Sequence, residues 1–172
     1  MRRVAIIASA GGNGKTTLGR ELARRKGVEF VEMDALVHGP GWTEISNDEL
    51  RRVLEPIVQR DAWVIDGVYS HKIGNLVVDA ADTIVWLDLP LWLKLRRIWK
   101  RTKHRIRNDV ELWNGNRETW RNALWGWDSL FWWMVRGHFR HRRGWPRLFG
   151  GDRRLVHLQS VGEANRWLSA HA

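Results

Sequence analysis

Short apolar runs alternate with amphipathic stretches along the 172 residues of the chain. Most of the runs are continuous, which is typical of strands buried on both faces of a parallel sheet. Glycine, aspartate or proline closes several of them, as expected where a strand gives way to a turn. The pattern predicts five strands, at residues 4–8, 28–32, 63–65, 83–87 and 155–158.

The stretches between the predicted strands have helical spacing. Residues 15–26 place Leu18 and Leu22 on one face and stop at Gly27. Ser46 and Glu49 form a capping box that predicts the start of another helix, which Pro56 is expected to kink or end early. Further helices are predicted at 91–107 and 163–170, and residues 108–150 are expected to be helical in two pieces.

This alternation of strands and helices predicts one α/β domain over residues 1–172, with three layers and a five-stranded parallel sheet flanked by helices. The segment between the fourth and fifth strands is about 60 residues long, far more than an ordinary crossover needs. We therefore expect residues 91–150 to form a basic, Trp-rich helical lid inserted into the domain.

The charge is unevenly distributed between the two halves of the chain. The whole chain carries 29 Lys/Arg and 19 Asp/Glu, a net charge of +10. Residues 1–90 hold 11 bases and 13 acids, whereas residues 91–172 hold 18 bases and 6 acids, a net charge of +12. Because 23 of the bases are arginine, which binds phosphate through two parallel hydrogen bonds, we expect a phosphate-rich partner.

Two absences narrow the function classes. The chain has no cysteine, so disulfides, thiol catalysis and Cys-ligated zinc are excluded, and a reducing cytoplasm is the expected location. It has no run of 18 uncharged apolar residues, so we expect no transmembrane segment. The chain starts with basic residues and an apolar stretch, as a signal peptide does. However, this apolar stretch is too short for a signal peptide, and a glycine-rich loop follows it instead of a cleavage site.

Residues 9–16 match the phosphate-binding pattern G-x-x-x-x-G-K-[ST], except that Ser9 replaces the first glycine. A chance glycine-rich turn is the alternative, but an apolar strand precedes the loop and a helix follows it, as the pattern requires. Backbone N–H groups of such a loop and the helix N-terminus bind phosphate oxygens. We expect Lys15 to contact the β- and γ-phosphates of ATP and Thr16 to ligate Mg²⁺. The predicted nucleotide-binding residues are Gly11, Gly12, Asn13, Gly14, Lys15, Thr16 and Thr17.

Three aspartates fall at predicted strand ends, where ligands of parallel sheets gather. Asp66 follows an apolar strand as in a Walker B motif, and we expect it to hold Mg²⁺ through the water shell of the ion. Asp34 ends the second strand, which we place beside the phosphate loop, and is the candidate base or aligner for an acceptor hydroxyl. Asp88 precedes Leu89-Pro90 and is expected to do no more than cap a helix. A turn or cap role is also the alternative for Asp34 and Asp66.

The helix at 91–107 places Arg97, Arg101 and Arg105 on one face. Eight Lys/Arg and no acid lie between Lys94 and Arg107, which indicates either a solvated basic face or a polyanionic partner. Arg97 and Arg101 are candidate catalytic residues, because arginine neutralises charge on a phosphoryl group in transit. Residues 115–120 form a polar cluster in which Asn116 and Arg117 suit contacts with hydroxyls and anions.

Together these stretches resemble the small P-loop kinases of the adenylate kinase and shikimate kinase type, and especially adenylate-kinase-like "DNA topology modulation" proteins. The resemblance rests on the loop at 9–17, Met33-Asp34, the segment 63–70 and the segment 84–90 that leads into the arginine helix. It implies a P-loop NTPase fold, ATP and Mg²⁺ as cofactors, and phosphoryl transfer to a small molecule. Nucleoside monophosphate kinases continue the Asp-Gly pair with Phe-Pro-Arg, whereas here Val68-Tyr69-Ser70 follows.

The sequence therefore predicts a cytoplasmic, ATP-dependent small-molecule kinase whose catalytic residues are Lys15, Asp34, Asp66, Arg97 and Arg101. A nucleic-acid-associated P-loop ATPase is the alternative, because the basic half suits a polyanion. Residues 111–145 also hold seven of the 13 tryptophans. Trp127, Leu130, Phe131, Met134 and Val135 keep helical spacing there, which predicts an amphipathic helix packed on the core. Contact with an anionic membrane or with nucleic-acid bases is the other interpretation. His104, His138 and His141 are interpreted as structural or basic-face residues.

Overall fold

The computed structural model describes residues 1–124 and 129–171. Over these residues the sheet has five parallel strands in the order β2-β3-β1-β4-β5. All five predicted strands are present, with ends that differ from prediction by at most one residue. They are β1 (Arg3–Ala8), β2 (Glu29–Glu32), β3 (Trp63–Asp66), β4 (Thr83–Leu87) and β5 (Leu155–Leu158).

The long helices also lie where the spacing placed them. Ser46 caps the third helix by accepting a hydrogen bond from the backbone N–H of Glu49, and this helix ends two residues after Pro56. The described helices are α1 (Lys15–Lys26), α2 (Met33–Val37), α3 (Asn47–Val58), α4 (Ser70–Ile73), α5 (Leu76–Ala80), α6 (Leu91–Arg107), α7 (Trp120–Leu124), α8 (Leu130–Phe149) and α9 (Val161–His171), with 3₁₀ turns η1 (Pro40–Trp42) and η2 (Trp113–Gly115).

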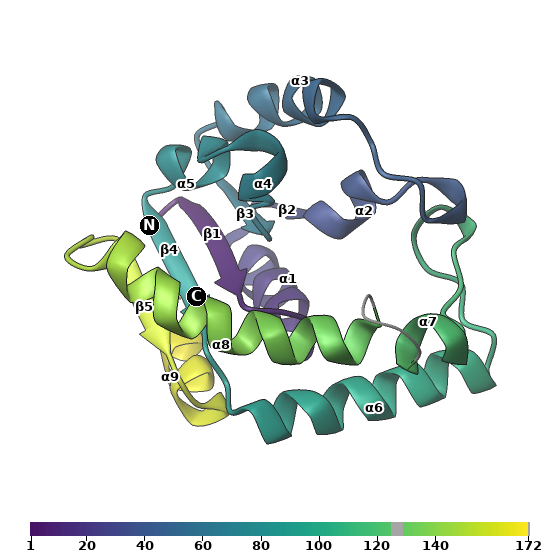
Figure 1. The fold of residues 1–172 in the computed structure, drawn as a ribbon. Helices are drawn as coiled ribbons and strands as arrows, with labels where there is room; N and C mark the ends of the chain where they lie inside the picture. The colour runs from purple at the N-terminus through teal and green to yellow at the C-terminus, as the bar shows by residue number, and fades with distance from the viewer. Residues whose placement is uncertain (125–128, 172) are drawn as a thin grey trace.

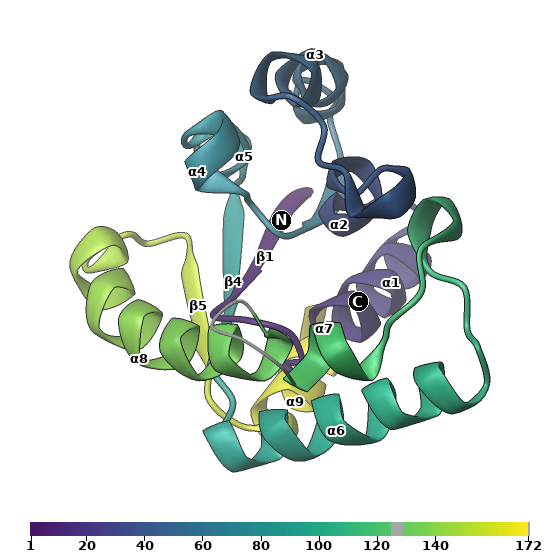
Figure 2. The same ribbon diagram turned by 45° about the vertical axis from the view of Figure 1, so that its right-hand side comes forward.

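Alternate residues of the central strands enter two separate cores. In β1, Ala5 and Ile7 face α3, α4 and α5, whereas Val4 and Ile6 face α1 and α9. The sheet is therefore the middle of three layers, as Figures 1 and 2 show. Both faces are covered, which explains why most of the strands are continuously apolar in sequence.

The segment after β4 has a different position. Helix α6 runs beyond the carboxyl ends of the strands, and α8 begins beside it and then crosses the sheet, where Trp145 and Phe149 pack against the core around Trp86 (Figures 1 and 2). Ile98 of α6 and Met134 of α8 form a small buried cluster with Ala10 of the loop after β1. The described part of residues 108–150 contains the two α-helices α7 and α8, as predicted, and the 3₁₀ turn η2 before them. Trp127, which we assigned to the second helix, lies outside the described residues.

Candidate active site

The loop after β1 has the backbone conformation of a phosphate cradle. Gly12 and Gly14 both adopt positive φ angles, of 78° and 86°. Any side chain at Gly12 would place its Cβ 2.8 Å from the carbonyl oxygen of Lys94, so only glycine fits this position. Asn13 is buried, donates to the carbonyl of Ala10 and accepts from the N–H of Leu89. These contacts hold the loop against the end of β4.

Lys15, Thr16 and Asp66 converge at the first turn of α1. The Lys15 ammonium lies 3.3 Å from Asp66 Oδ1, and the Thr16 hydroxyl donates to Asp66 Oδ2 at 2.6 Å. Asp66 is only 4% exposed, and its Oδ1 atom accepts no hydrogen bond from the described part of the chain. A hydroxyl and a buried carboxylate this close together fit a Mg²⁺ site, because magnesium prefers oxygen ligands and keeps several waters.

Asp34 lies in the first turn of α2, at the carboxyl edge of the sheet. The Tyr69 hydroxyl donates to Asp34 Oδ1 at 2.6 Å and lies 3.5 Å from Nε2 of His38. Burial raises the pKa of Tyr69 above its usual range, and the nearby Asp34 carboxylate raises it further, so the phenol stays protonated and acts as a donor. The predicted adjacency of β2 and the P-loop strand is wrong, because β3 pairs between them.

Three arginines of α6 line the same cleft from below. Arg97 donates to the carbonyl of Gly12 at 3.4 Å, and Arg105 forms an ion pair with Glu118 at 2.5 Å. Arg101 lies 3.9 Å from Glu118, and its buried Nε atom has no hydrogen-bond partner in the described residues. Burial lowers the pKa of the Arg101 guanidinium, and the neighbouring Arg105 lowers it further. The Arg101 side chain is 39% exposed and lines the cleft, so the exposed part of its guanidinium is available to an anionic ligand.

These groups surround one open cleft of about 1670 Å³. The P-loop, Asp34 and Tyr69 line it, and α8 contributes Trp133 and Arg140. The volume exceeds that of ordinary single-ligand pockets, which leaves room for a nucleotide and a second small molecule.

The polar cluster around Asn116 connects two loops instead of facing the cleft with free groups. Asn116 is buried, accepts from the N–H of Trp42 at 2.8 Å and donates to the carbonyls of Gly39 and Trp113. Arg117 forms ion pairs with Asp109 and Glu111. The predicted contacts of this pair with a substrate are therefore replaced by contacts that tie η2 to η1.

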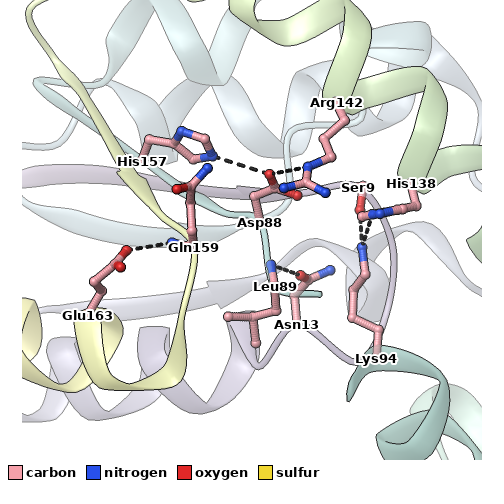
Figure 3. Close-up of polar contacts among 10 residues, drawn as sticks. All are labelled: Ser9, Asn13, Asp88, Leu89, Lys94, His138, Arg142, His157, Gln159 and Glu163. Carbon is pink, nitrogen blue, oxygen red and sulfur yellow. Dashed lines mark hydrogen bonds and ion pairs between the residues drawn. The ribbon is translucent and has the colours of Figure 1, made fainter. Parts of the chain in front are cut away.

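Behind the P-loop lies a buried polar network that the sequence did not indicate (Figure 3). By sequence Lys94 belongs to the run of bases that indicates a solvated basic face or a polyanionic partner, but its side chain is fully buried. Its ammonium lies 3.0 Å from the Ser9 hydroxyl and 2.6 Å from Nδ1 of His138. Burial lowers the pKa of Lys94 to about 8 and also lowers the pKa of His138. Lys94 thus joins α6 and α8 to the first residue of the P-loop.

Asp88 belongs to the same buried region, and its expected role as a helix cap is wrong. The residue before α6 is Pro90, and Asp88 is 2% exposed. Its Oδ2 accepts from Arg142 of α8 at 2.8 Å and lies 3.4 Å from Nε2 of His157 on β5. Asp88 therefore connects α8 to the sheet at the ends of β4 and β5.

Sequence reasoning singled out Lys15, Thr16, Asp34 and Asp66. The first three line one cleft, and Asp66 is buried next to it, in contact with Lys15 and Thr16. It missed His38, which packs against Trp42 and stacks on Trp113 at the mouth of the cleft. The one signal for His38 in the sequence is its position four residues after Asp34, which ends a predicted strand.

Known proteins with similar sequences are small kinases. No protein-family model matches the chain. It is 28% identical over 107 residues to a shikimate kinase of Corynebacterium glutamicum, covering 55% of this chain and 63% of that protein. It is 33% identical over 85 residues to a cytidylate kinase of Aeropyrum pernix, covering 49% of this chain and 46% of that one. The chain thus spans less than two thirds of either relative.

Solved structures with the same fold cover nearly the whole chain. The shikimate kinase of Acinetobacter baumannii in complex with shikimate matches with a TM-score of 0.60 and 17% identity, covering 99% of this chain and 90% of that one. The deoxyadenosine kinase of M. mycoides with bound dCTP matches with a TM-score of 0.56 and 12% identity, covering 97% and 96%. The predicted P-loop kinase fold is therefore confirmed.

Proposed function

We propose that this protein is an ATP-dependent phosphotransferase that transfers the γ-phosphoryl group of ATP to a small-molecule acceptor. The proposal rests on one observation: Lys15 and Thr16 contact the buried Asp66 carboxylate at the end of a loop that has the backbone conformation of a P-loop. The similarity to shikimate and cytidylate kinases supports it. Lys15 would bind the β- and γ-phosphates, while Thr16 and Asp66 would hold Mg²⁺, which neutralises phosphate charge when it is bound.

The acceptor would bind between Asp34, Tyr69 and the inner side of α8. Asp34 would accept the proton of the attacking hydroxyl, or orient that hydroxyl, while Tyr69 fixes the carboxylate. Arg97 and Arg101 would neutralise the charge of the phosphoryl group during in-line transfer, as α6 closes the site against water. Val68-Tyr69-Ser70 in place of Phe-Pro-Arg argues against a nucleoside monophosphate as the acceptor. The cytoplasm remains the predicted location.

An acceptor screen with γ-labelled ATP and Mg²⁺ tests this function, with ATP hydrolysis in the absence of acceptor measured alongside. Lys15→Ala should abolish nucleotide turnover and weaken ATP binding in calorimetry. Lys26→Ala removes the same charge from the other end of α1 and serves as the matched control. Full turnover in Lys15→Ala would overturn the assignment.

A nucleic-acid-associated ATPase is the second candidate, and the charge of +12 in residues 91–172 is the observation that favours it. In that case ATP hydrolysis should rise when DNA or RNA is added, and binding should weaken steeply with salt. Stimulation by a small acceptor with no effect of nucleic acid would exclude this candidate.

A further inference from the structure

Helices α6 and α8 carry the same alternation of aromatic and basic side chains. In each helix the order is aromatic, basic, aromatic, basic at positions i, i+4, i+7 and i+11, which lie on one helix face. We call the two stripes together the Trp/Arg face. It consists of Trp92, Arg96, Trp99 and Lys103 on α6, and Trp132, Arg136, Phe139 and Arg143 on α8.

Both stripes point to the same side of the molecule. The opposite face of α6 buries Lys94 and Ile98 against the P-loop, and the opposite face of α8 buries Met134 there. Trp99 contacts Phe131 of α8, with ring centroids 6.2 Å apart. Figures 1 and 2 show the two helices beside each other. Because both turn their buried faces to the same loop, we infer that their outer faces adjoin.

The aromatic side chains of this face are exposed to an unusual degree. Single exposed apolar residues are common on protein surfaces, but several exposed aromatic side chains on one face indicate an interaction site. The exposed fractions are 63% for Trp92, 51% for Phe139, 44% for Trp99 and 39% for Trp132. Trp120 of α7 extends the set, since its ring lies 5.7 Å from that of Trp99.

The charge of the face is equally one-sided. Neither α6 nor α8 contains an aspartate or glutamate. The four bases of the face form no ion pair with any acid in the described ranges 1–124 and 129–171. These bases alternate with the aromatic residues along each helix. A partner that fits the face therefore carries negative charge directly beside an apolar region.

We propose that the Trp/Arg face docks on an anionic lipid bilayer. Headgroup phosphates would meet the bases, while the indole and phenyl rings enter the boundary between headgroups and acyl chains. Leu124 of α7, the helix that contacts α8, is 45% exposed and cannot stack on a nucleic-acid base as an aromatic ring can, so an apolar phase suits this surface better than a nucleic acid. Docking through this face leaves the ATP cleft open on the other side of α6 and α8.

Vesicle co-sedimentation of the full chain tests the proposal. Vesicles of phosphatidylcholine alone are compared with vesicles in which about a third of the lipid is phosphatidylglycerol. Binding to the anionic vesicles alone, weakened by added salt, is the expected result. Arg96→Gln/Arg136→Gln should lower the affinity about thirtyfold, because each base near an anionic surface contributes about 1 kcal/mol. Trp92→Ser/Phe139→Ser should lower it about tenfold.

Matched controls change the same chemistry elsewhere on the molecule. Arg52→Gln/Arg153→Gln removes two exposed charges, and Val53→Ser removes an exposed apolar side chain from α3. Each variant is first checked for unchanged circular dichroism and thermal midpoint. If the controls reduce binding as much as the face variants, the binding is a non-specific effect of net charge and the proposal is wrong.

Two other results would also overturn the proposal. One is the absence of binding to anionic vesicles at low salt. The other is binding to single-stranded or duplex oligonucleotides, lost in the face variants, without vesicle binding, which would assign the face to nucleic acid. Sedimentation needs no turnover of ATP, so failure of this proposal and failure of the kinase proposal give different results.

Discussion

The buried ammonium of Lys94 makes the stability of the fold depend on pH in a defined direction. Burial lowers its pKa from the ordinary lysine value of 10.5 to about 8 in the native protein. In the unfolded chain the group returns to its ordinary value. Between these two pH values the unfolded chain binds a proton that the native protein does not, so raising the pH favours the native state.

The size of the effect follows from linkage. Below the native pKa, holding the lysine in its charged form costs about 3 kcal/mol of stability. This cost falls by about 2.5 kcal/mol between about pH 7 and about pH 10. Lys94→Met removes the cost but also leaves the Ser9 hydroxyl and the His138 ring without their partner, which costs about 1–3 kcal/mol for each. These effects oppose each other at neutral pH, so the dependence on pH is the clearer observable.

Urea denaturation at a series of pH values measures how the free energy of unfolding depends on pH. The free energy of unfolding of the wild type, relative to Lys94→Met, should rise by about 2.5 kcal/mol over this range. Lys100→Met changes an exposed lysine six residues further along α6 and should keep the wild-type slope. If Lys94→Met and the wild type show the same dependence on pH, then Lys94 is not the buried, charged group described here.

Three further substitutions test other contacts of the cleft. Asn116→Ala removes the bond to the N–H of Trp42, so we expect a loss of about 2 kcal/mol and faster hydrogen exchange in residues 38–42; unchanged exchange would contradict the link between the loops. Tyr69→Phe removes a bond to a carboxylate worth about 1.5 kcal/mol, so acceptor-dependent turnover should fall about tenfold, with ATP affinity unchanged. Arg142→Ala leaves the Asp88 carboxylate buried without its main partner. Because Arg142 itself is half exposed, we expect a loss of about 2 kcal/mol in thermal or urea unfolding, and no loss would show that the pair is dispensable.

Much of the fold was predictable because its signals are local. Helix α6 runs from Leu91 to Arg107, as predicted, since its apolar stripe begins directly after Pro90. The P-loop was predictable because its glycines, lysine and threonine lie within eight residues and perform one task together. The strand-end rule likewise placed Asp66 near the loop, because the carboxyl ends of parallel strands meet at one edge.

The pairing of distant elements was not predictable from these signals. The order of the strands along the sequence does not show that β3 separates β2 from β1, because strand pairing depends on contacts between segments that are distant in sequence. The short helices α4 and α5 were missed because four or five residues carry no helical period.

The sequence by itself determined the class of fold and the chemistry of the phosphate loop, because both are written in short, contiguous patterns. Tertiary structure alone decided which charges are buried. Lys94 belongs by sequence to a run of bases, yet packing of α6 and α8 on the P-loop removes it from water while Arg96, two residues on, stays exposed. Burial of a polar group depends on what covers it, and the segments that cover Lys94 lie 85 residues before it and 44 residues after it.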